Sequence, residues 1–296
     1  MVCACIDIGS NTTRLLVAEP DGGRVRELLR QRAFTRIGKG LASEDAIPQR
    51  KIAEVVEVVG TQVRVARELG SETIRLVATA AIRDAVNQEE LTGAIAARTG
   101  IDVDVLTDEE EARLAFVGAT CALDHPPDGD IAVVDVGGAS SEIAIGTTAG
   151  GVRASSSFRV GSGTLTDSYL RSDPPAIHEL SQIRAHVAGT FEGFVLPETE
   201  LAVAVGGSAT SLRRLVGNLL DHESLERGLR MLARTPSEEL ARTAEIEVER
   251  ARLLPAGLLI LEEISDRLGR PLGVGRGGLR EGVIVDMLIT AGWGAA

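Results

Sequence analysis

The chain has 296 residues, with 31 Lys and Arg against 43 Asp and Glu, which gives a formal net charge of −12. Hydrophobic residues make up 44% and charged residues 25%, a profile typical of globular proteins that excludes a disordered chain. At about 100–200 residues per domain, this length predicts two domains or one large domain. The acidic charge argues against a nucleic-acid or anionic-membrane partner, and an aromatic content of 2% leaves few rings for stacking on bases.

The sequence has neither a targeting signal nor a disulfide pattern. The first residues lack a basic region and reach Asp7 before an apolar run long enough for a signal peptide. The longest apolar stretch, around Leu253–Ile264, contains a proline and two glutamates and is too short to span a bilayer. Cys3, Cys5 and Cys121 are typical of reduced, buried thiols. We therefore expect a cytoplasmic protein without a membrane partner.

The first half of the chain alternates strands and helices. In chain order, hydrophobic periodicity predicts a strand hairpin at Ala4–Val17, a third strand at Arg24–Arg32, a helix at Pro48–Leu69, a strand at Thr73–Ala78, a helix at Ala80–Arg98, a strand at Ile101–Leu106 and a helix at Asp108–Ala119.

The second half follows the same order and adds helices, which indicates an insertion. The pattern predicts a hairpin at Ala132–Ile145, a third strand at Val152–Val160, helices at Ser162–Leu170 and Pro175–Phe194, a strand at Leu201–Val205, a helix at Ser208–Leu219, a helical stretch at His222–Leu268, a strand at Leu272–Val274 and a helix at Gly278–Leu288.

The two hairpins are an internal repeat with a constant offset of 128 residues. The first reads ACIDIGSNTTRLLV and the second AVVDVGGASSEIAI, and each has an aspartate near the end of its first strand and a turn of small residues. At this offset Asp7 aligns with Asp135, Gly9 with Gly137, Thr12 with Ser140 and Thr13 with Ser141.

The segment Asp124–Asp130, with two prolines, a glycine and acidic residues, is typical of a domain boundary. We predict two α/β domains, residues 1–122 and residues 123–296, built from a duplicated βββαβα unit, with a cleft between them. By chain order the final helix belongs to the second domain, but packing against the first domain is an alternative.

The glycine-rich turns are candidate phosphate sites, because backbone N–H groups in such turns donate to an anion without side-chain bulk. The candidate residues are Gly9, Ser10, Asn11 and Thr12 in the first turn, and Gly137, Gly138, Ala139, Ser140 and Ser141 in the second. A carboxylate is the wrong group for direct contact with an anion. Asp7 and Asp135 therefore favour a hard cation, Mg²⁺ first of all, between them and the phosphates. The alternative is that both hairpins only shape turns.

Two further segments carry groups suited to anions. Gly206, Gly207 and Ser208 follow a buried strand and open a helix, and a helix N-terminus binds phosphates or nucleotides. Arg83 lies just inside a predicted helix, where it would contact phosphate or, as is commoner, pair with a carboxylate.

The acidic triplet Glu109–Glu111 begins a predicted helix. Thr107 and Glu110 have the spacing of a capping box, which explains the first glutamates structurally. Glu111 shares a helix face with Leu114 and Ala115, so we expect its carboxylate to point inward. There it would orient or deprotonate a water for attack on phosphorus.

Seven segments together resemble one family. They read IDIGSNTTRLLVA, RIGKGL, ATAAIRDA, EEEARLAFVGA, VVDVGGASSEIAIG, AVGGSATSL and GLREG, and they occur in order from Ile6 to about Leu288. This set resembles the exopolyphosphatase and guanosine pentaphosphate phosphohydrolase (Ppx/GppA) family of the actin-like ATPase superfamily, in its short two-domain form.

The resemblance implies a fold of two actin-like, ribonuclease H-like domains and Mg²⁺-dependent hydrolysis of terminal phosphoanhydrides. It assigns Glu111 to water activation, Asp135 and Glu142 to an acidic pair at the second turn, and Arg83 to the phosphate site. Ala139 departs from the family pattern, which usually has a glycine there. The large C-terminal helical extension of the long members is also missing from the sequence.

We therefore expect an exopolyphosphatase that releases orthophosphate from chain ends. Guanosine pentaphosphate is the alternative substrate, because it presents the same terminal anhydride, and Arg14 near the first turn would favour its extra phosphates. A second class of function is an actin-like kinase or nucleotide-binding scaffold, with ADP or ATP at Gly206–Ser208. A homodimer is compatible with the sequence, as is a monomer.

Overall fold

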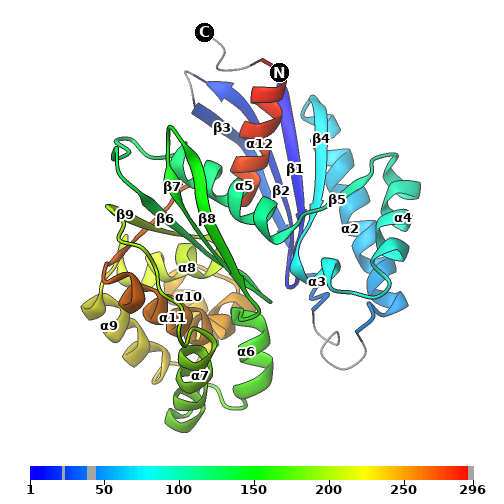
Figure 1. Cartoon of the computed structure of the whole chain (residues 1–296). Coiled ribbons are helices and arrows are strands. Elements are labelled where there is room, and N and C mark those ends of the chain that lie inside the picture. Colours follow the sequence, from blue (N-terminus) through cyan, green and yellow to red (C-terminus); the bar gives the residue numbers. More distant parts are fainter. Residues whose placement is uncertain (22–23, 39–44, 293–296) are drawn as a thin grey trace. The chain divides into compact units, whose positions relative to one another are not determined.

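The computed structural model of the chain describes residues 1–21, 24–38 and 45–292. Part of the RIGKGL segment, from Lys39 onward, lies outside these residues. The chain divides into two compact units, one made of Met1–Ala122 with Gly277–Ala296 and the other of Leu123–Arg276 (Figure 1). Each unit contains one sheet with helices packed on it.

The first unit has a five-stranded sheet in the order β3-β2-β1-β4-β5. Its strands are β1 (Val2–Ile8), β2 (Thr13–Asp21), β3 (Arg24–Ala33), β4 (Ser71–Ala78) and β5 (Val103–Val105). Successive residues of β1 point to opposite faces, so both faces are apolar. Ile6 packs with α2 (Gln49–Glu68) and α4 (Gln88–Thr99), whereas Cys5 packs with α5 (Asp108–Thr120) and α12 (Leu279–Thr290).

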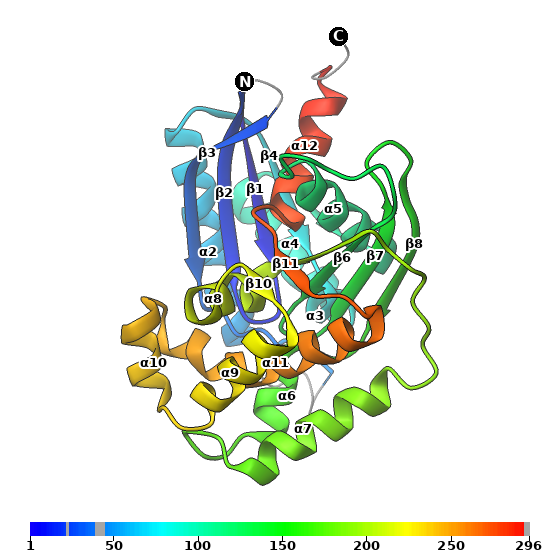
Figure 2. The same ribbon diagram turned by 90° about the vertical axis from the view of Figure 1, so that its left-hand side faces the viewer.

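Glycines let α5 and α12 approach backbone to backbone. A Cβ on Gly118 would lie 1.9 Å from the carbonyl oxygen of Gly278, and a Cβ on Gly282 would lie 1.8 Å from that of Leu114. Figures 1 and 2 show the two helices side by side. Chain order assigned the last helix to the second domain, but the structure packs it into the first unit, where its apolar face covers the sheet. Gly118 of α5 and Gly282 of the GLREG segment therefore have a packing role.

The second unit has a six-stranded sheet in the order β10-β11-β9-β6-β7-β8. Its strands are β6 (Ile131–Val136), β7 (Ser141–Thr147), β8 (Gly151–Phe158), β9 (Leu201–Val205), β10 (Leu219–Leu220) and β11 (Leu272–Val274). The helices are α6 (Ser162–Tyr169), α7 (Ile177–Thr190), α8 (Gly206–Val216), α9 (His222–Leu232), α10 (Ser237–Ala244) and α11 (Val248–Leu268). They enclose one apolar core with the sheet.

The structure departs from the prediction at two elements, one helix and one strand, and at one cysteine. The single helix expected at Ala80–Arg98 is two helices, α3 (Ala80–Arg83) and α4, because the Asn87 side chain bonds both backbone groups of Ile47 and holds the chain between them in a loop. The stretch His222–Leu268 is three helices, and the short strand β10 was not expected. Cys121, expected to be buried, is exposed. Among the described residues no helix is both long and apolar enough to cross a bilayer.

The duplication is visible in the strand pairing. β8-β7-β6-β9-β11 repeats the order β3-β2-β1-β4-β5, and the register keeps the offset of the sequence repeat. In the first unit Asp7 pairs with Arg14 and Val77, and in the second Asp135 pairs with Glu142 and Val205. The second and third strands of both units also contain a bulge at the same place, between Val17 and Ala18 and between Ile145 and Gly146. The two turns are therefore copies of one backbone design.

Candidate active site

The first turn links β1 to β2 and is closed by its own backbone. The N–H of Gly9 donates to the carbonyl of Thr12 at 3.0 Å, and the carbonyl of Ser10 accepts from Gly38 at 2.8 Å. Thr12 is buried, and its hydroxyl accepts a hydrogen bond from Nε of Arg14 at 2.8 Å. Hydrogen bonds from Gly38 and from Arg14 therefore hold the turn in place, in addition to the bond within it.

The second turn repeats these bonds. The N–H of Gly137 donates to the carbonyl of Ser140 at 2.9 Å, and the carbonyl of Gly138 accepts from Gly163 at 2.8 Å. The backbone of α6 lies so close that a Cβ on Gly161 would be 2.4 Å from the carbonyl carbon of Gly138. Ser141 is buried and its hydroxyl donates to the carbonyl of Val160 at 2.6 Å.

Both turns have backbone N–H groups that can donate to a ligand. Within the described ranges, the N–H groups of Ser10, Asn11, Gly138 and Ala139 donate to no protein group. These residues are partly exposed, so their N–H groups are not sealed in the core. Converging backbone donors of this kind are what an anionic oxygen requires.

Asp7 lies at the end of β1, 8% exposed, directly opposite Arg14 on β2. Burial raises the pKa of this carboxyl, because the charged form loses its hydration, and the charges of Arg14 and Arg280 partly oppose the rise. The carboxylate therefore lies in an environment where a positive partner is favourable.

Asp135 lies at the matching position of β6, opposite a second carboxylate, that of Glu142 on β7. Glu142 is 3% exposed and accepts a hydrogen bond from the hydroxyl of Ser157 at 3.1 Å. Gly206, with φ +80°, lies beside this pair, and a Cβ there would be 2.2 Å from Oδ1 of Asp135. Like charges directly opposite each other in a sheet are unfavourable, so a bound cation would stabilise this arrangement.

The donor chemistry fits a hard cation, although a complete protein cage is lacking. Among the described residues no three His, Cys, Asp or Glu side chains come together as a metal-binding group. Mg²⁺ commonly takes only one or two carboxylates and completes its coordination with phosphate oxygens and waters. The pair of Asp135 and Glu142 meets that requirement within its own unit.

Glu111 is in the first turn of α5, and the helix start has the predicted capping box between Thr107 and Glu110. Glu111 points inward, as expected, and is 9% exposed. The guanidinium of Arg83, at the end of α3, donates to Oε2 of Glu111 at 3.2 Å and to the carbonyl of Leu106 at 2.6 Å, and it also binds Asp108. Of the two roles considered for Arg83, the structure shows the pairing with carboxylates.

The third glycine turn lies at the start of α8. Ser208 is 1% exposed, and its hydroxyl packs toward α11, where a Cβ on Gly257 would be 2.7 Å from it. A Cβ on Gly207 would lie 2.7 Å from a guanidinium nitrogen of Arg250, a residue that is 3% exposed. Ser208 thus faces a helix contact, and a buried arginine lies directly beside the turn.

The predicted site residues thus fall into a group in each unit. Asp7, Gly9–Thr12, Arg83 and Glu111 belong to the first unit, and Asp135, Gly137–Glu142 and Gly206–Ser208 to the second. Sequence reasoning missed two contributors. Ser157 could have been found from the alternation of its strand, whereas the sequence around Arg250 reads as an ordinary helix and gives no such signal.

Comparisons with known proteins agree on one family. The family model for the Ppx/GppA phosphatase family matches residues 16–291. Exopolyphosphatase 2 of Mycobacterium tuberculosis is 29% identical over 96% of both chains. Exopolyphosphatase 1 of Mycobacterium leprae is 26% identical over 98% of this chain and 91% of its own. A guanosine-5'-triphosphate,3'-diphosphate pyrophosphatase of Photobacterium profundum is 27% identical over 96% of this chain, which spans 59% of that protein.

Solved structures show the same fold. The Ppx/GppA family member of Aquifex aeolicus matches with a TM-score of 0.83 and 28% identity, and covers 98% of both chains. An exopolyphosphatase of Cytophaga hutchinsonii matches with a TM-score of 0.87 over 98% of both chains, at 20% identity. The prediction of a two-domain actin-like α/β fold is confirmed.

Proposed function

Because the chain belongs to the Ppx/GppA phosphatase family, we propose that it is an exopolyphosphatase that hydrolyses the terminal phosphoanhydride of inorganic polyphosphate and releases orthophosphate. The observation that carries the proposal is the inward-facing Glu111, held by Arg83 at the start of α5. The names of the mycobacterial relatives, both exopolyphosphatases, support the choice of substrate.

In the proposed reaction Glu111 acts as the general base. A water oxygen attacks the terminal phosphorus, the bridging P–O bond breaks, and the shortened chain leaves with the bridging oxygen. The proton of the water passes to the carboxylate of Glu111. Arg83 keeps this carboxylate oriented through its bond to Oε2, and its anchors on Leu106 and Asp108 limit its own movement.

In the proposed reaction the backbone N–H groups of the glycine turns donate hydrogen bonds to the phosphate oxygens. Charge accumulates on the oxygens of the transferred phosphoryl group during reaction, and preorganised donors stabilise it without reorganising. Ser10 and Asn11 in one unit, and Gly138 and Ala139 in the other, carry the N–H groups suited to this role. We assign the remaining residues of each turn to the same role.

We further propose that the reaction requires Mg²⁺ or another divalent cation. Asp135 and Glu142 would hold the ion, with Asp7 as a further carboxylate. When bound, the ion would neutralise charge on phosphate oxygens. The support for this is that two carboxylates face each other across β6 and β7, beside the close approach of Gly206, since carboxylate oxygens are the ligands that Mg²⁺ prefers.

Guanosine pentaphosphate is the second candidate substrate. The observation that favours it is Arg14, whose guanidinium lies at the first turn on Thr12, and the name of the Photobacterium relative points the same way. ADP or ATP at Gly206–Ser208, a cytoplasmic location and a homodimer stay predictions.

The test is orthophosphate release from a panel of substrates by the full chain. The panel contains tripolyphosphate, long-chain polyphosphate, guanosine pentaphosphate and ATP, each with Mg²⁺ and with a chelator. We expect the highest kcat/KM on a polyphosphate and loss of release with the chelator. A higher kcat/KM on guanosine pentaphosphate would overturn the choice of substrate, and transfer of labelled phosphate to an added acceptor in place of water would overturn hydrolysis.

A further inference from the structure

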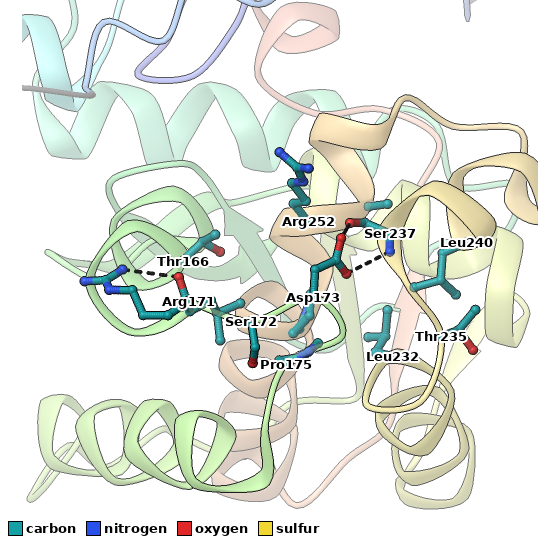
Figure 3. Close-up of a pocket in the computed structure, with 13 residues that line it drawn as sticks. Thr166, Arg171, Ser172, Asp173, Pro175, Leu232, Thr235, Ser237, Leu240 and Arg252 are labelled. Atoms are coloured by element: carbon teal, nitrogen blue, oxygen red, sulfur yellow. Dashed lines mark hydrogen bonds between the residues drawn. The ribbon is translucent and has the colours of Figure 1, made fainter.

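The second unit contains a cavity apart from the glycine turns. It has a volume of about 330 Å³ and lies between the end of α6, the loop that follows it, the α9–α10 connection and α11 (Figure 3). We call it the helical pocket. Its walls come from the helical part of the second unit. The connection from β9 to β11, which carries α9, α10 and α11, is longer than the matching connection from β4 to β5, which carries α3 and α4, whereas α6 follows the third strand as α2 does in the first unit. The volume falls at the lower end of the range for small-molecule sites, roughly 300–1,000 Å³.

Most charges around the helical pocket are already used within the protein. The carboxylate of Asp173 accepts from the backbone N–H of Ser237 at 2.9 Å and also binds its hydroxyl. The guanidinium of Arg171 donates to three carbonyl groups at the end of α6, those of Asp167, Ser168 and Leu170. Figure 3 shows the Arg171 side chain directed toward that helix end.

Arg252 is different. It lines the pocket from α11, is exposed, and has no hydrogen-bond or ion-pair partner among the residues that the structure describes. Six of the other twelve lining residues are apolar, among them Leu232, Leu240 and Pro255, so the wall includes an apolar part beside this cation. One available cation beside apolar walls fits a ligand with one anionic group and an apolar body.

The pocket also connects to the glycine turns of its own unit. α6 lines it with Thr166 near the C-terminal end, and the other end of α6 clasps the second turn, where Ser162 and Gly163 donate to Gly137 and Gly138 at 2.9 and 2.8 Å. The helix has only eight residues. A ligand that shifts its end therefore acts directly on the backbone of the phosphate turn.

We propose that the helical pocket binds a small organic anion with an apolar body, its anionic group on Arg252, and that occupancy is transmitted through α6 to the turn at Gly137–Ser141. Binding and transmission do not depend on which phosphoanhydride the protein hydrolyses. Binding of such an anion would shift the backbone N–H groups of the turn, and so would change the affinity of the turn for phosphate.

Two fluorescent probes of nearly equal shape test the binding. Anilinonaphthalene sulfonate has an apolar body with one sulfonate, and N-phenylnaphthylamine is its uncharged counterpart. We expect saturable binding of both to the full chain at one site. Arg252→Gln should raise the Kd of the sulfonate about 10-fold and leave the uncharged probe unchanged, whereas the exposed-arginine control Arg227→Gln should change neither. Thr235→Phe, which fills the pocket, should abolish the binding of both.

Three results would overturn the proposal. Equal affinities in the wild type and Thr235→Phe place the probes elsewhere. If Arg252→Gln raised the Kd of both probes equally, Arg252 would not recognise the anionic group. Hydrogen exchange of a peptide covering Gly137–Ser141 should change at least about 2-fold in rate on saturation with the sulfonate, and an unchanged rate with binding intact removes the transmission. Thermal unfolding of each variant verifies that it is folded.

Discussion

The two hairpins share a backbone but differ in the charge that faces their aspartates. Asp7 on β1 lies opposite Arg14, and Asp135 on β6 lies opposite Glu142, at the same register positions. The difference continues on the third strand, where Arg32 pairs with Arg14 in one unit and Ser157 with Glu142 in the other. One hairpin thus carries an acid followed by two basic residues across its strands, and the other carries two acids.

The two copies share the geometry of the turn and differ in the residue that faces the aspartate. Turn geometry depends on backbone hydrogen bonds and small residues, and both copies keep those bonds. The residue opposite the aspartate has no part in the turn, so its charge is free to change. We expect the acid pair to serve a cation, and the arginine-bearing hairpin to serve the anionic substrate.

The sharpest test exchanges the two facing residues for the same neutral side chain. Glu142→Gln removes one carboxylate of the proposed cation site and should lower kcat at fixed Mg²⁺ by about 100-fold. Arg14→Gln should act mainly on KM, because it removes a positive group near the substrate. Steady-state phosphate release over a range of Mg²⁺ concentrations measures both effects.

Glu142→Gln keeps the shape of the side chain, whereas Arg14→Gln shortens it and removes its bond to Thr12. Ser157→Ala serves as a control that leaves both carboxylates in place. If Arg14→Gln and Glu142→Gln had the same effect on kcat and on the Mg²⁺ requirement, the division of roles between the hairpins would be wrong.

A second test concerns the glycine beside the acid pair. Gly206→Ala should destabilise the protein by about 2 kcal/mol or more, since φ at this position is +80° and the new Cβ would meet the Asp135 carboxylate. The matching position in the first unit is Ala78, fully buried at the end of β4. Ala78→Gly should cost about 1–2 kcal/mol through backbone entropy and the loss of a buried methyl group, with no strain of the backbone. Chemical denaturation gives both values, and an unfolding free energy unchanged by Gly206→Ala would contradict the close approach.

The smallest expected effect is on stability, at Asp7. Burial raises the pKa of this carboxyl above its ordinary value of 3.8, so the wild type loses stability as the pH rises through the raised pKa. Asn at this position does not ionise. In chelator-containing buffer, Asp7→Asn should therefore be more stable than the wild type at pH 7, with the gain vanishing below about pH 4.

Denaturation at the two pH values measures this difference, with the exposed Asp102→Asn as a control that should show no such trend. A variant that is less stable than the wild type at pH 7 and equal to it in acid would reverse the sign of the argument. The same variant should also lose activity, since it removes a proposed carboxylate near the cation.

The sequence predicted β1, β6 and β9 well because each is a buried apolar run, whereas the two-residue strand β10 was missed. The repeat, the α5 capping box and the inward face of Glu111 were all readable from spacing alone. The capping box and the face of Glu111 depend on residues a few positions apart, and the repeat is visible when the two segments are aligned.

What the sequence could not show depends on contacts between distant residues. The bond between Asn87 and Ile47 breaks a predicted helix, and nothing in the apolar period reports it. The packing of α12 on α5 depends on glycines in separate segments of the chain. The ion pair of Arg83 with Glu111 was one of two roles open from the sequence, because Glu111 lies 28 positions further along the chain.

The most direct test of the account compares Glu111→Gln with Glu109→Gln, its exposed neighbour in the same helix turn. The measured quantity is orthophosphate release from tripolyphosphate at saturating substrate and Mg²⁺. The account predicts a fall of about 100- to 10,000-fold in kcat for Glu111→Gln, and a rate within about 2-fold of the wild type for Glu109→Gln. Wild-type kcat in a folded Glu111→Gln variant would contradict it.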